Sequence, residues 1–255
     1  MAAGTQAGGS PAALLEVRGL SKRFGGLQAV SDLSLAMAEG EMLGLIGPNG
    51  AGKTTVFNLV SGFLRPDAGE IRFRGQSIVG LKPHAICRQG LARTFQLVRP
   101  FPHLSVLDNV KVAALTRHAR TPEARARARA VVERVGLAPR ADVAAGRLTL
   151  AERKCLELAR ALATEPTLLL LDEVMAGLNA TETEGIVRLI TRINESGVSM
   201  LLIEHNMRAV MALSHRIVVL SFGEKIAEGT PSAVASDARV IEAYLGEEYV
   251  HAAPA

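Results

Sequence analysis

The segment from Gly47 to Thr54 holds the residues best suited to phosphate chemistry in this sequence of 255 residues. It reads Gly-Pro-Asn-Gly-Ala-Gly-Lys-Thr and fits the pattern G-x-x-x-x-G-K-S/T at every position. Glycines let backbone N–H groups converge on a phosphate, Lys53 can reach the outer phosphates of a nucleotide, and the Thr54 hydroxyl can ligate Mg²⁺. The residues expected to bind the phosphates are Gly47, Pro48, Asn49, Gly50, Ala51, Gly52, Lys53, Thr54 and Thr55.

Two adjacent acids, Asp172 and Glu173, follow the apolar run at residues 168–171. At the carboxyl end of a buried strand, Asp172 can hold Mg²⁺ opposite Thr54, and Glu173 can orient or deprotonate an attacking water. Acids after a strand commonly cap the next helix instead. The phosphate loop in the same chain favours the catalytic interpretation of both acids.

His205 directly follows a strand expected at residues 198–204. A lone histidine is more often an ordinary polar residue than a catalytic one. Ligands of parallel sheets nevertheless gather at the carboxyl ends of the strands, where an imidazole can contact a γ-phosphate oxygen. We therefore expect His205, Glu173 and Lys53 to be the catalytic residues.

The elements that position these residues follow from hydrophobic periodicity. Apolar and polar residues alternate at 14–20, 33–37 and 71–74, as they do in half-exposed strands. Buried strands are expected at the continuous apolar runs, which cover residues 42–46, 168–171, 198–203 and 217–220. Helical spacing at 54–64 directly follows the phosphate loop. This strand–loop–helix order disfavours the alternative of a glycine-rich turn that fits the pattern by chance.

Apolar runs that alternate with helices predict an α/β fold whose parallel sheet is covered on both faces. We expect a core at about residues 14–96 and 162–230, interrupted by a helical subdomain at about 97–161, where Arg and Ala replace the strand-like runs. A packing helix is expected at about 232–250, and residues 1–13 are expected to form a flexible terminus.

The charge balance is only mildly basic, with 29 Lys and Arg against 25 Asp and Glu and a net charge of +4. Residues 117–160 alone hold eleven basic and five acidic residues, which favours a solvated helical face over a surface for nucleic acid or lipid phosphates. Cys87 and Cys155 have no metal-ligand or redox spacing, as is usual in a reducing cytosol. Because no apolar run approaches ~20 residues, we expect a soluble, cytoplasmic protein.

Taken in order, the motifs resemble the ATPase subunit of ABC transporters over about residues 14–249. The residues that carry the resemblance are Phe24, Gly47–Thr55, Gln96, Leu148–Glu152, Asp172–Glu173, Asn179 and His205. The resemblance implies an α/β fold of P-loop NTPase (RecA-like) type over residues 14–250, with a mainly parallel sheet, an N-terminal antiparallel β part and an inserted helical subdomain. It also implies hydrolysis of ATP with Mg²⁺ as cofactor.

The resemblance implies a role for several single residues. Phe24 corresponds to the aromatic side chain that stacks on adenine, and Gln96 to the glutamine that links Mg²⁺ to the helical subdomain. The implied Mg²⁺ ligands are therefore Thr54, Gln96 and Asp172. His205 corresponds to the switch histidine, and the segment 176–179 to the loop that crosses the interface between two subunits.

Several short segments of the sequence are similar to one group of ABC transporters in particular, the importers for branched-chain and other hydrophobic amino acids. The segments concerned are Phe24–Leu27, Phe57–Gly62, Arg93–Gln96, Ala176–Asn179, Ile203–Met207 and Ala243–Gly246. The implied partners are a second ATPase subunit, identical or different, two membrane permease subunits and, indirectly, a substrate-binding protein, with no nucleic acid. The implied location is peripheral, on the cytoplasmic face of the bacterial plasma (inner) membrane.

The signature motif departs from the family pattern Leu-Ser-Gly-Gly-Gln, which docks on the γ-phosphate of the partner subunit. Here it reads Leu148, Thr149, Leu150, Ala151 and Glu152. Thr149-x-x-Glu152 is a capping box that starts a helix, but the Glu152 carboxylate partly cancels the positive field at that helix end. Val174 also replaces a proline that often follows the catalytic acid. We therefore hypothesise that this chain hydrolyses ATP at its own site and serves the site of its partner less well.

Three other functions remain as alternatives. A switch GTPase is disfavoured because no Asn-Lys-x-Asp motif follows the loop. An ABC-type ATPase acting on nucleic acid or ribosomes usually has two cassettes or a long coiled coil, and 255 residues leave room for neither. A non-hydrolysing regulatory subunit would retain full turnover of its complex when Glu173 is replaced.

Overall fold

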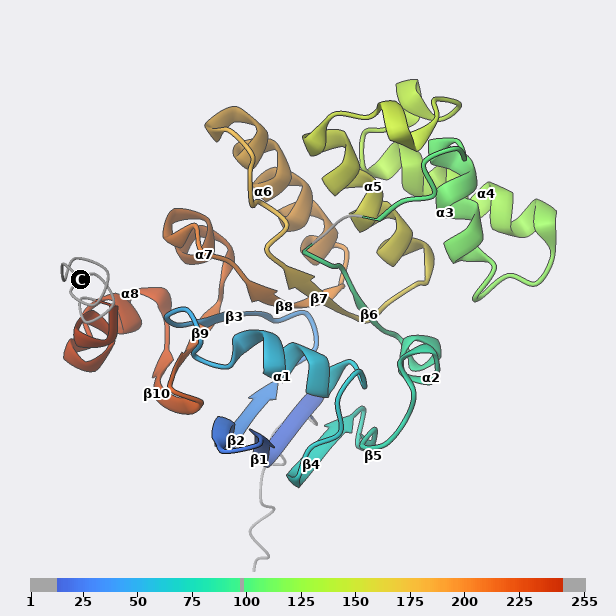
Figure 1. Ribbon diagram of the computed structural model, residues 1–255. Coiled ribbons are helices and arrows are strands. Elements are labelled where there is room, and N and C mark those ends of the chain that lie inside the picture. Colours follow the sequence, from blue (N-terminus) through green and yellow to red (C-terminus); the bar gives the residue numbers. More distant parts are fainter. Residues whose placement is uncertain (1–12, 97–98, 245–255) are drawn as a thin grey trace, which may run out of the picture.

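Ten strands form two sheets in the part of the chain that the computed structural model describes, residues 13–96 and 99–244. The first sheet is antiparallel and has the order β2-β1-β4-β5. Its strands are β1 (Leu15–Phe24), β2 (Leu27–Met37), β4 (Ala68–Phe73) and β5 (Gln76–Ser77). In Figure 1 this sheet lies at the bottom of the molecule, below α1 (Lys53–Val60).

The second sheet has the order β10-β9-β3-β8-β7-β6 and is parallel except for β10. Its strands are β3 (Met42–Ile46), β6 (Leu91–Arg93), β7 (Leu168–Asp172), β8 (Ser199–Ile203), β9 (Arg216–Ser221) and β10 (Glu224–Gly229). Because β3, β6, β7 and β8 run in the same direction, the segments that follow them emerge at one edge of the sheet.

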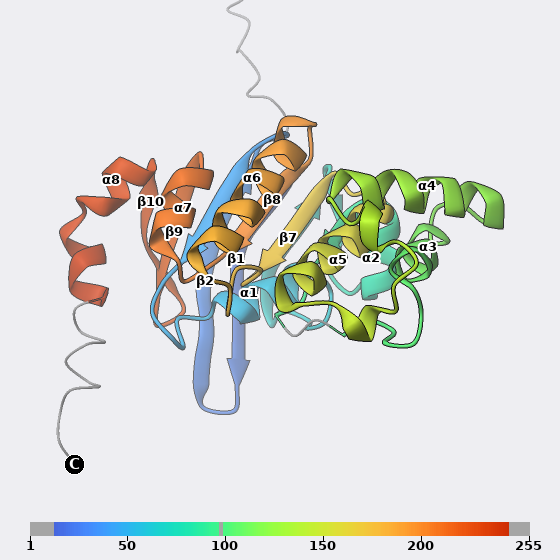
Figure 2. The same cartoon turned by 90° about the horizontal axis from the view of Figure 1, so that it is seen from above.

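Each face of the second sheet is covered by a different layer. Leu168 and Leu170 pack with Phe57 of α1 and with the antiparallel sheet, whereas Leu169 and Leu171 pack on the other face with the helices. This alternation is the two-residue period of a strand that is buried on both sides. The covering helices are α5 (Leu150–Ala163), α6 (Ala180–Glu195) and α7 (Met207–Leu213), which lie above the sheet in Figure 1 and in front of it in Figure 2.

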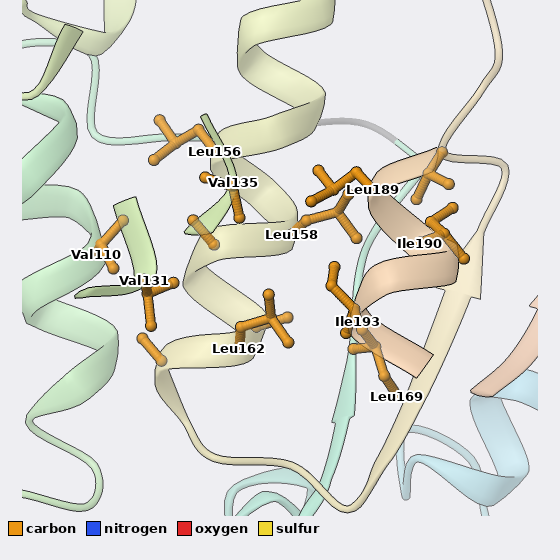
Figure 3. Packing of buried hydrophobic residues seen from close by; sticks show 14 of the residues in the cluster. Val110, Val131, Val135, Leu156, Leu158, Leu162, Leu169, Leu189, Ile190 and Ile193 are labelled. Carbon is orange, nitrogen blue, oxygen red and sulfur yellow. The ribbon is translucent and has the colours of Figure 1, made fainter. Parts of the chain in front are cut away.

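The helical subdomain is joined to the core through α5. Its other helices are α3 (Val106–Ala114) and α4 (Thr121–Arg134), with the short 3₁₀ turns η1 (Ala138–Arg140) and η2 (Ala145–Arg147). Figure 3 shows Leu158 and Leu162 of α5 facing Ile193 of α6, while Val110 and Val131 lie on the opposite side of α5. One continuous apolar cluster therefore runs from the subdomain through α5 into the core.

Several elements are longer or shorter than the periodicity predicts. The strands expected at 14–20 and 33–37 are present, but they extend to Phe24 and back to Leu27, which makes them the arms of a hairpin. The helix expected at 54–64 ends at Val60, because Gly62 adopts a φ of 77°. The short or polar elements were missed, namely β5, β6, β10 and α2 (Pro83–Gln89).

The C-terminal region differs from the single helix expected at 232–250. Helix α8 (Pro231–Ala235) has Thr230 as its N-cap and Ser236 as its C-cap, and a separate helical run covers residues 238–244. Residues 245–250, and residues 1–12 of the expected flexible terminus, lie outside the described part. Within the described residues, no helix combines the length and apolar character needed to cross a bilayer.

Candidate nucleotide site

The phosphate loop connects the end of β3 to the start of α1, and close packing explains two of its glycines. A Cβ on Gly47, whose φ is 150°, would lie 2.1 Å from the carbonyl oxygen of Leu220. A Cβ on Gly52, whose φ is 100°, would lie 2.3 Å from the carbonyl oxygen of Ala29. The loop is therefore held tightly between β9 and β2, which only glycine permits at these two positions.

The loop presents positive charge toward its concave side. Lys53 is buried, and its Nζ donates to the carbonyl oxygens of Gly47 at 2.5 Å and Pro48 at 2.8 Å. Helix α1 has Gly52 as its N-cap, with no side-chain cap and no acidic residue in its first turn. The N–H groups and the dipole of α1 therefore remain available to an anion.

A cavity of about 400 Å³ opens in front of the loop. Its residues are Phe24, Leu27, Gln28, Ala29, Asn49, Gly50, Ala51, Gly52, Lys53, Thr54, Thr55, Glu173, His205 and Phe222. The β1–β2 hairpin supplies an apolar half through Phe24 and Leu27, and the phosphate loop supplies a polar half. A pocket with one apolar wall and one cationic wall fits a nucleotide, which has an aromatic base and an anionic tail.

Phe222 is a lining residue that sequence reasoning missed. It is 91% exposed and has a φ of 46°, a conformation that is rare for an aromatic residue. The neighbouring Gly223 donates its N–H to Ala51 at 3.1 Å and accepts from Ser31 at 2.8 Å, which fixes this turn against the phosphate loop. The signal in the sequence was an aromatic residue placed two positions after the apolar run at 217–220 and directly before a glycine.

Glu173 is held by side chains from two neighbouring strand ends. Gln96 Nε2, after β6, donates to Glu173 Oε2 at 2.6 Å, and His205 Nε2, after β8, lies 3.0 Å from Glu173 Oε1. Glu173 itself has a φ of 48°, the left-handed region that a non-glycine residue rarely adopts. Such backbone conformations persist where the surroundings hold them and are concentrated at functional sites. The carboxylate is therefore oriented at the cavity wall, where it can accept a proton from a water molecule.

Asp172 is paired inside the protein. Its Oδ2 accepts from Arg93 Nη2 at 2.7 Å, and both side chains are nearly buried. Arg93 also donates to Asn58 Oδ1 at 2.6 Å and lies over the ring of Phe57 at 5.5 Å. Sequence reasoning did not assign this role to Arg93, because an arginine in a three-residue strand carries no pattern of its own.

A second cavity, of about 490 Å³, adjoins the first one at Thr54. Its lining includes Thr54, Gln96 and Asp172, the three residues expected to hold Mg²⁺. Hydroxyl, amide and carboxylate oxygens are hard donors of the kind that Mg²⁺ prefers. Among the described residues, no three His, Cys, Asp or Glu side chains gather as a metal site. The donor set therefore fits an ion that takes its remaining ligands from phosphates and water.

Behind Glu173 lies a buried charged cluster that the sequence did not reveal, formed by Lys154, Glu157 and Glu204. Lys154 Nζ donates to the main-chain oxygen of Glu173 at 3.0 Å, and Glu204 Oε1 accepts from the N–H of Met175 at 2.8 Å. Burial lowers the pKa of Lys154 and raises the pKa of both Glu157 and Glu204. The only sequence signal was the position of these charged residues on core-facing sides of their elements.

The signature segment forms the capping box that its sequence predicts. Glu152 N–H donates to Thr149 Oγ1 at 3.2 Å, and Thr149 N–H donates to Glu152 Oε2 at 2.8 Å. Arg140 Nε donates to Glu152 Oε1 at 2.8 Å. The hydrogen bond from Thr149 and the guanidinium of Arg140 lower the pKa of Glu152. Within this chain, none of the residues Leu148–Glu152 lines either cavity.

Comparison with known proteins gives two family matches. The family described as "ABC transporter" matches residues 30–176, and the family "Branched-chain amino acid ATP-binding cassette transporter" matches residues 224–250. The first match covers more than half of the chain and includes the phosphate loop and both acids after β7.

Similar proteins of closely matching length include two amino acid transport subunits. The high-affinity branched-chain amino acid transport ATP-binding protein BraF of Pseudomonas aeruginosa is 43% identical over 251 residues, which cover 92% of this chain and 98% of BraF. LivG of Escherichia coli K12, which has the same description, is 43% identical over 250 residues, with the same two coverages. The lipopolysaccharide export system ATP-binding protein LptB of the same strain is 37% identical over 238 residues, or 93% of this chain and 99% of LptB.

Solved structures agree with these matches. The ADP conformation of MJ1267, an ATP-binding cassette of an ABC transporter, superimposes with a TM-score of 0.84 at 28% identity. This superposition covers 92% of the chain and 99% of MJ1267. CbiO1 from Clostridium perfringens, part of the ABC transporter complex cbiONQ, superimposes with a TM-score of 0.81 at 26% identity, over 90% of the chain and 93% of cbiO1.

Proposed function

We infer that this chain, which belongs to the ABC transporter family of ATP-binding proteins, is the ATP-hydrolysing motor subunit of an importer for branched-chain or other hydrophobic amino acids. The observation that carries the enzymatic part is Glu173, whose carboxylate is held by Gln96 and His205 at the wall of the phosphate-loop cavity. The C-terminal family match and the names of the 43% identical relatives support the amino acid substrate over the lipopolysaccharide named for LptB.

We propose that ATP lies with its base on Phe24 and its phosphates on the loop from Gly47 to Thr55. The apolar hairpin supports the first assignment, since an adenine ring stacks well on an exposed aromatic side chain. The uncapped start of α1 and the inward-facing ammonium of Lys53 support the second assignment. His205 borders the same cavity and is placed to contact the terminal phosphate while it orients Glu173.

Mg²⁺ fits the second cavity, where Thr54, Gln96 and Asp172 would hold it. When bound, the ion supplies positive charge that neutralises the phosphate oxygens. The Asp172 carboxylate is suited to this task because its ion pair with Arg93, at 2.7 Å, fixes its position. Gln96, which is bonded to Glu173, directly precedes the segment that leads into the helical subdomain.

In the proposed reaction, Glu173 accepts a proton from water as the water oxygen attacks the γ-phosphorus and ADP departs. The two hydrogen bonds to Glu173 fix both carboxylate oxygens, so the base does not have to be ordered during the reaction. Lys53 donates to the phosphate oxygens, on which negative charge is stabilised by a fixed cation. Residues 176–179 and the signature at Leu148–Glu152 would face a second ATPase subunit, identical or different, which completes the site.

We propose that one of two membrane permease subunits docks on the groove between the core and the helical subdomain, and that the other docks on the second ATPase subunit. This groove has a volume of about 370 Å³. Its lining includes Phe63 and Phe95, which form an edge-to-face pair at 5.7 Å, and Val112 of α3. Phe63, Phe95 and Val112 are exposed, as are Phe101, Leu104 and Leu115 nearby in the chain. Clustered exposed apolar side chains are typical of a protein interface, which supports a protein partner at this groove.

Such docking would place the chain peripherally on the cytoplasmic face of a bacterial inner membrane, with a substrate-binding protein acting through the permeases. The test is purification of the full chain from membranes with its associated proteins, followed by reconstitution into vesicles. ATP-driven uptake of labelled leucine is the expected result. ATPase activity that RNA or DNA stimulates, with no associated permease, would overturn the transport function in favour of a nucleic acid machine.

The altered signature supports a second proposal, that the two ATP sites of the complex are unequal. The Glu152 carboxylate occupies the first turn of α5 and accepts from the N–H of Thr149, which leaves less positive field at this helix end for the partner's ATP. We expect Glu173→Gln in this subunit to reduce turnover more than the equivalent change in its partner. Equal losses from the two changes would contradict the asymmetry, and unchanged turnover after Glu173→Gln would indicate a regulatory, non-hydrolysing subunit.

A further inference from the structure

Lys154 is a charged residue in a position where a charge is costly. It lies on α5, two residues after the signature, and only 4% of its surface is exposed. An ammonium loses its hydration when it is buried and is retained only where it makes specific contacts. The contacts of Lys154 therefore indicate what this residue does.

The ammonium bonds to main-chain oxygens on both sides of the catalytic contact. Its Nζ donates to the carbonyl oxygen of Glu173 at 3.0 Å and to that of Gln96 at 3.4 Å. The side chains of the same two residues meet at 2.6 Å on the cavity side. Lys154 thus joins the main chains of Gln96 and Glu173, the two residues whose side chains meet at the cavity.

The carboxylates around Lys154 have other partners. Glu157 pairs with Arg160 at 3.0 Å, and Glu204 accepts from the N–H of Met175 at 2.8 Å. Asp172 pairs with Arg93 at 2.7 Å. Because each of these acids is bonded elsewhere, the directed contacts of the ammonium are those with the two carbonyl groups. The surrounding negative charge keeps the ammonium in place without competing for its hydrogen bonds.

We propose that Lys154 is a positioning residue for hydrolysis, which ties α5 to the catalytic glutamate. Its bond to the Glu173 carbonyl stabilises the left-handed backbone, with a φ of 48°, that aims the carboxylate into the cavity. This role rests on the proposed function, in which α5 begins at the signature that would face the partner's ATP. A shift of α5 at one ATP site would then move the base of the other site through Lys154.

The test is steady-state ATP hydrolysis by the full chain in its transporter complex, with Lys154→Met and Lys154→Gln. The methionine fills the space but donates no hydrogen bond, whereas the glutamine keeps an N–H donor on an uncharged side chain. We expect Lys154→Met to lower kcat about tenfold with little change in the KM for ATP, and Lys154→Gln to lower kcat about threefold. The matched control is Lys225→Met, because Lys225 also donates to a carbonyl group, that of Ser34, but lies at the surface of β10.

Each result decides the proposal. A kcat of Lys154→Met within about twofold of the wild type would overturn it, as would equal losses in kcat and in ATP affinity for both variants. If Lys154→Met fails to fold, the cycle of Lys154→Gln, Gln96→Ala and the double variant serves instead. If the double variant loses less kcat than the two single variants predict together, Lys154 and Gln96 share one task, as proposed. If the losses in kcat are additive, the proposal is overturned. Absence of hydrolysis in the wild-type complex would refute the proposed function itself, which distinguishes the two failures.

Discussion

At the scale of single residues, the site depends on side chains that are fixed before any ligand arrives. Asp172 is held by Arg93, and Glu173 is held by Gln96 and His205. Preorganised groups of this kind do not pay an ordering cost during the reaction. The chemistry therefore depends on supporting residues as much as on the acids themselves.

Arg93 gives the first prediction at this scale. Removing one partner of a buried pair leaves an uncompensated charge, so Arg93→Met is expected to cost about 3–5 kcal/mol of unfolding free energy. The control is Arg18→Met, which breaks an exposed pair with Glu16 and is expected to cost less than about 1 kcal/mol. Urea unfolding of both variants at neutral pH measures the difference. Equal costs would contradict the structural role of the buried pair.

Phe222 gives the second prediction at the scale of single residues. Because its ring lines the apolar half of the cavity, Phe222→Ala is expected to weaken ATP binding about three- to tenfold through lost contact with the base. Inhibition by tripolyphosphate, which has no base, should remain unchanged. The matched control is Phe101→Ala, an exposed phenylalanine outside this cavity. A parallel loss of tripolyphosphate binding would assign Phe222 to the shape of the phosphate loop instead.

Only part of the site is predictable from sequence at this scale. The phosphate loop carries a local pattern, because its backbone geometry requires glycine at fixed positions such as Gly47 and Gly52. Arg93, Lys154 and Phe222 carry no such pattern. Their partners are distant in sequence, and the sheet brings them together only when the chain has folded.

At the scale of elements, strand periodicity predicted the buried strands well and the polar ones poorly. β7 and β8 are continuous apolar runs because both of their faces are covered. β10, with the sequence Glu-Lys-Ile-Ala-Glu-Gly, is an edge strand, and its polar residues face solvent. Its pairing with β9 depends on the turn at Phe222 and Gly223, which hydrophobicity alone does not reveal.

Helix α5 gives the prediction at the element scale, because its capping box includes a carboxylate. The folded-state pKa of Glu152 lies below its ordinary value of 4.5, so the carboxylate stabilises the fold above that pH, and this contribution is lost as the pH falls through the folded-state value. Glu152→Gln is expected to cost a few tenths to about 1 kcal/mol at neutral pH and progressively less in acid.

Thermal unfolding of wild type and Glu152→Gln between neutral pH and about pH 4 measures this effect. Glu184→Gln is the control, because Glu184 is exposed on α6 and lies 3.8 Å from Arg188. A constant difference between wild type and Glu152→Gln across the range would show that the carboxylate charge is not what stabilises α5.

At the scale of the whole molecule, three exposed apolar side chains, Phe63, Phe95 and Val112, lie beside the nucleotide site. The groove that contains Phe63, Phe95 and Val112 also contains Arg93, the partner of Asp172. The second cavity, with Gln96, shares Phe95 and Arg93 with this groove. A protein that occupies the groove is therefore one side chain away from the proposed Mg²⁺ ligands.

Val112 gives the prediction at this scale. Val112→Glu places a charge on the apolar groove, at a position that is 41% exposed, so it is expected to reduce recovery of associated permease at least tenfold. ATP binding by the isolated chain should be unchanged, because Val112 lines neither nucleotide cavity. Quantitative co-purification measures the loss.

The control for Val112→Glu is Ile241→Glu, which places the same charge on an exposed apolar residue of the C-terminal helical run. Normal permease recovery with Val112→Glu, or an equal loss with Ile241→Glu, would exclude the groove as the docking surface.

The contacts of Lys53 make nucleotide binding an exchange reaction. The ammonium is already satisfied by the carbonyl oxygens of Gly47 and Pro48, so it acts as an internal counter-ligand that keeps the loop in shape. The free energy that a phosphate gains from Lys53 is only the difference between its own hydrogen bond to the ammonium and the hydrogen bonds that it replaces. The loop can therefore release its product readily, because the lysine has a resting partner to which it returns. A motor that must bind and discard a nucleotide in every cycle benefits more from such reversibility than from maximal affinity.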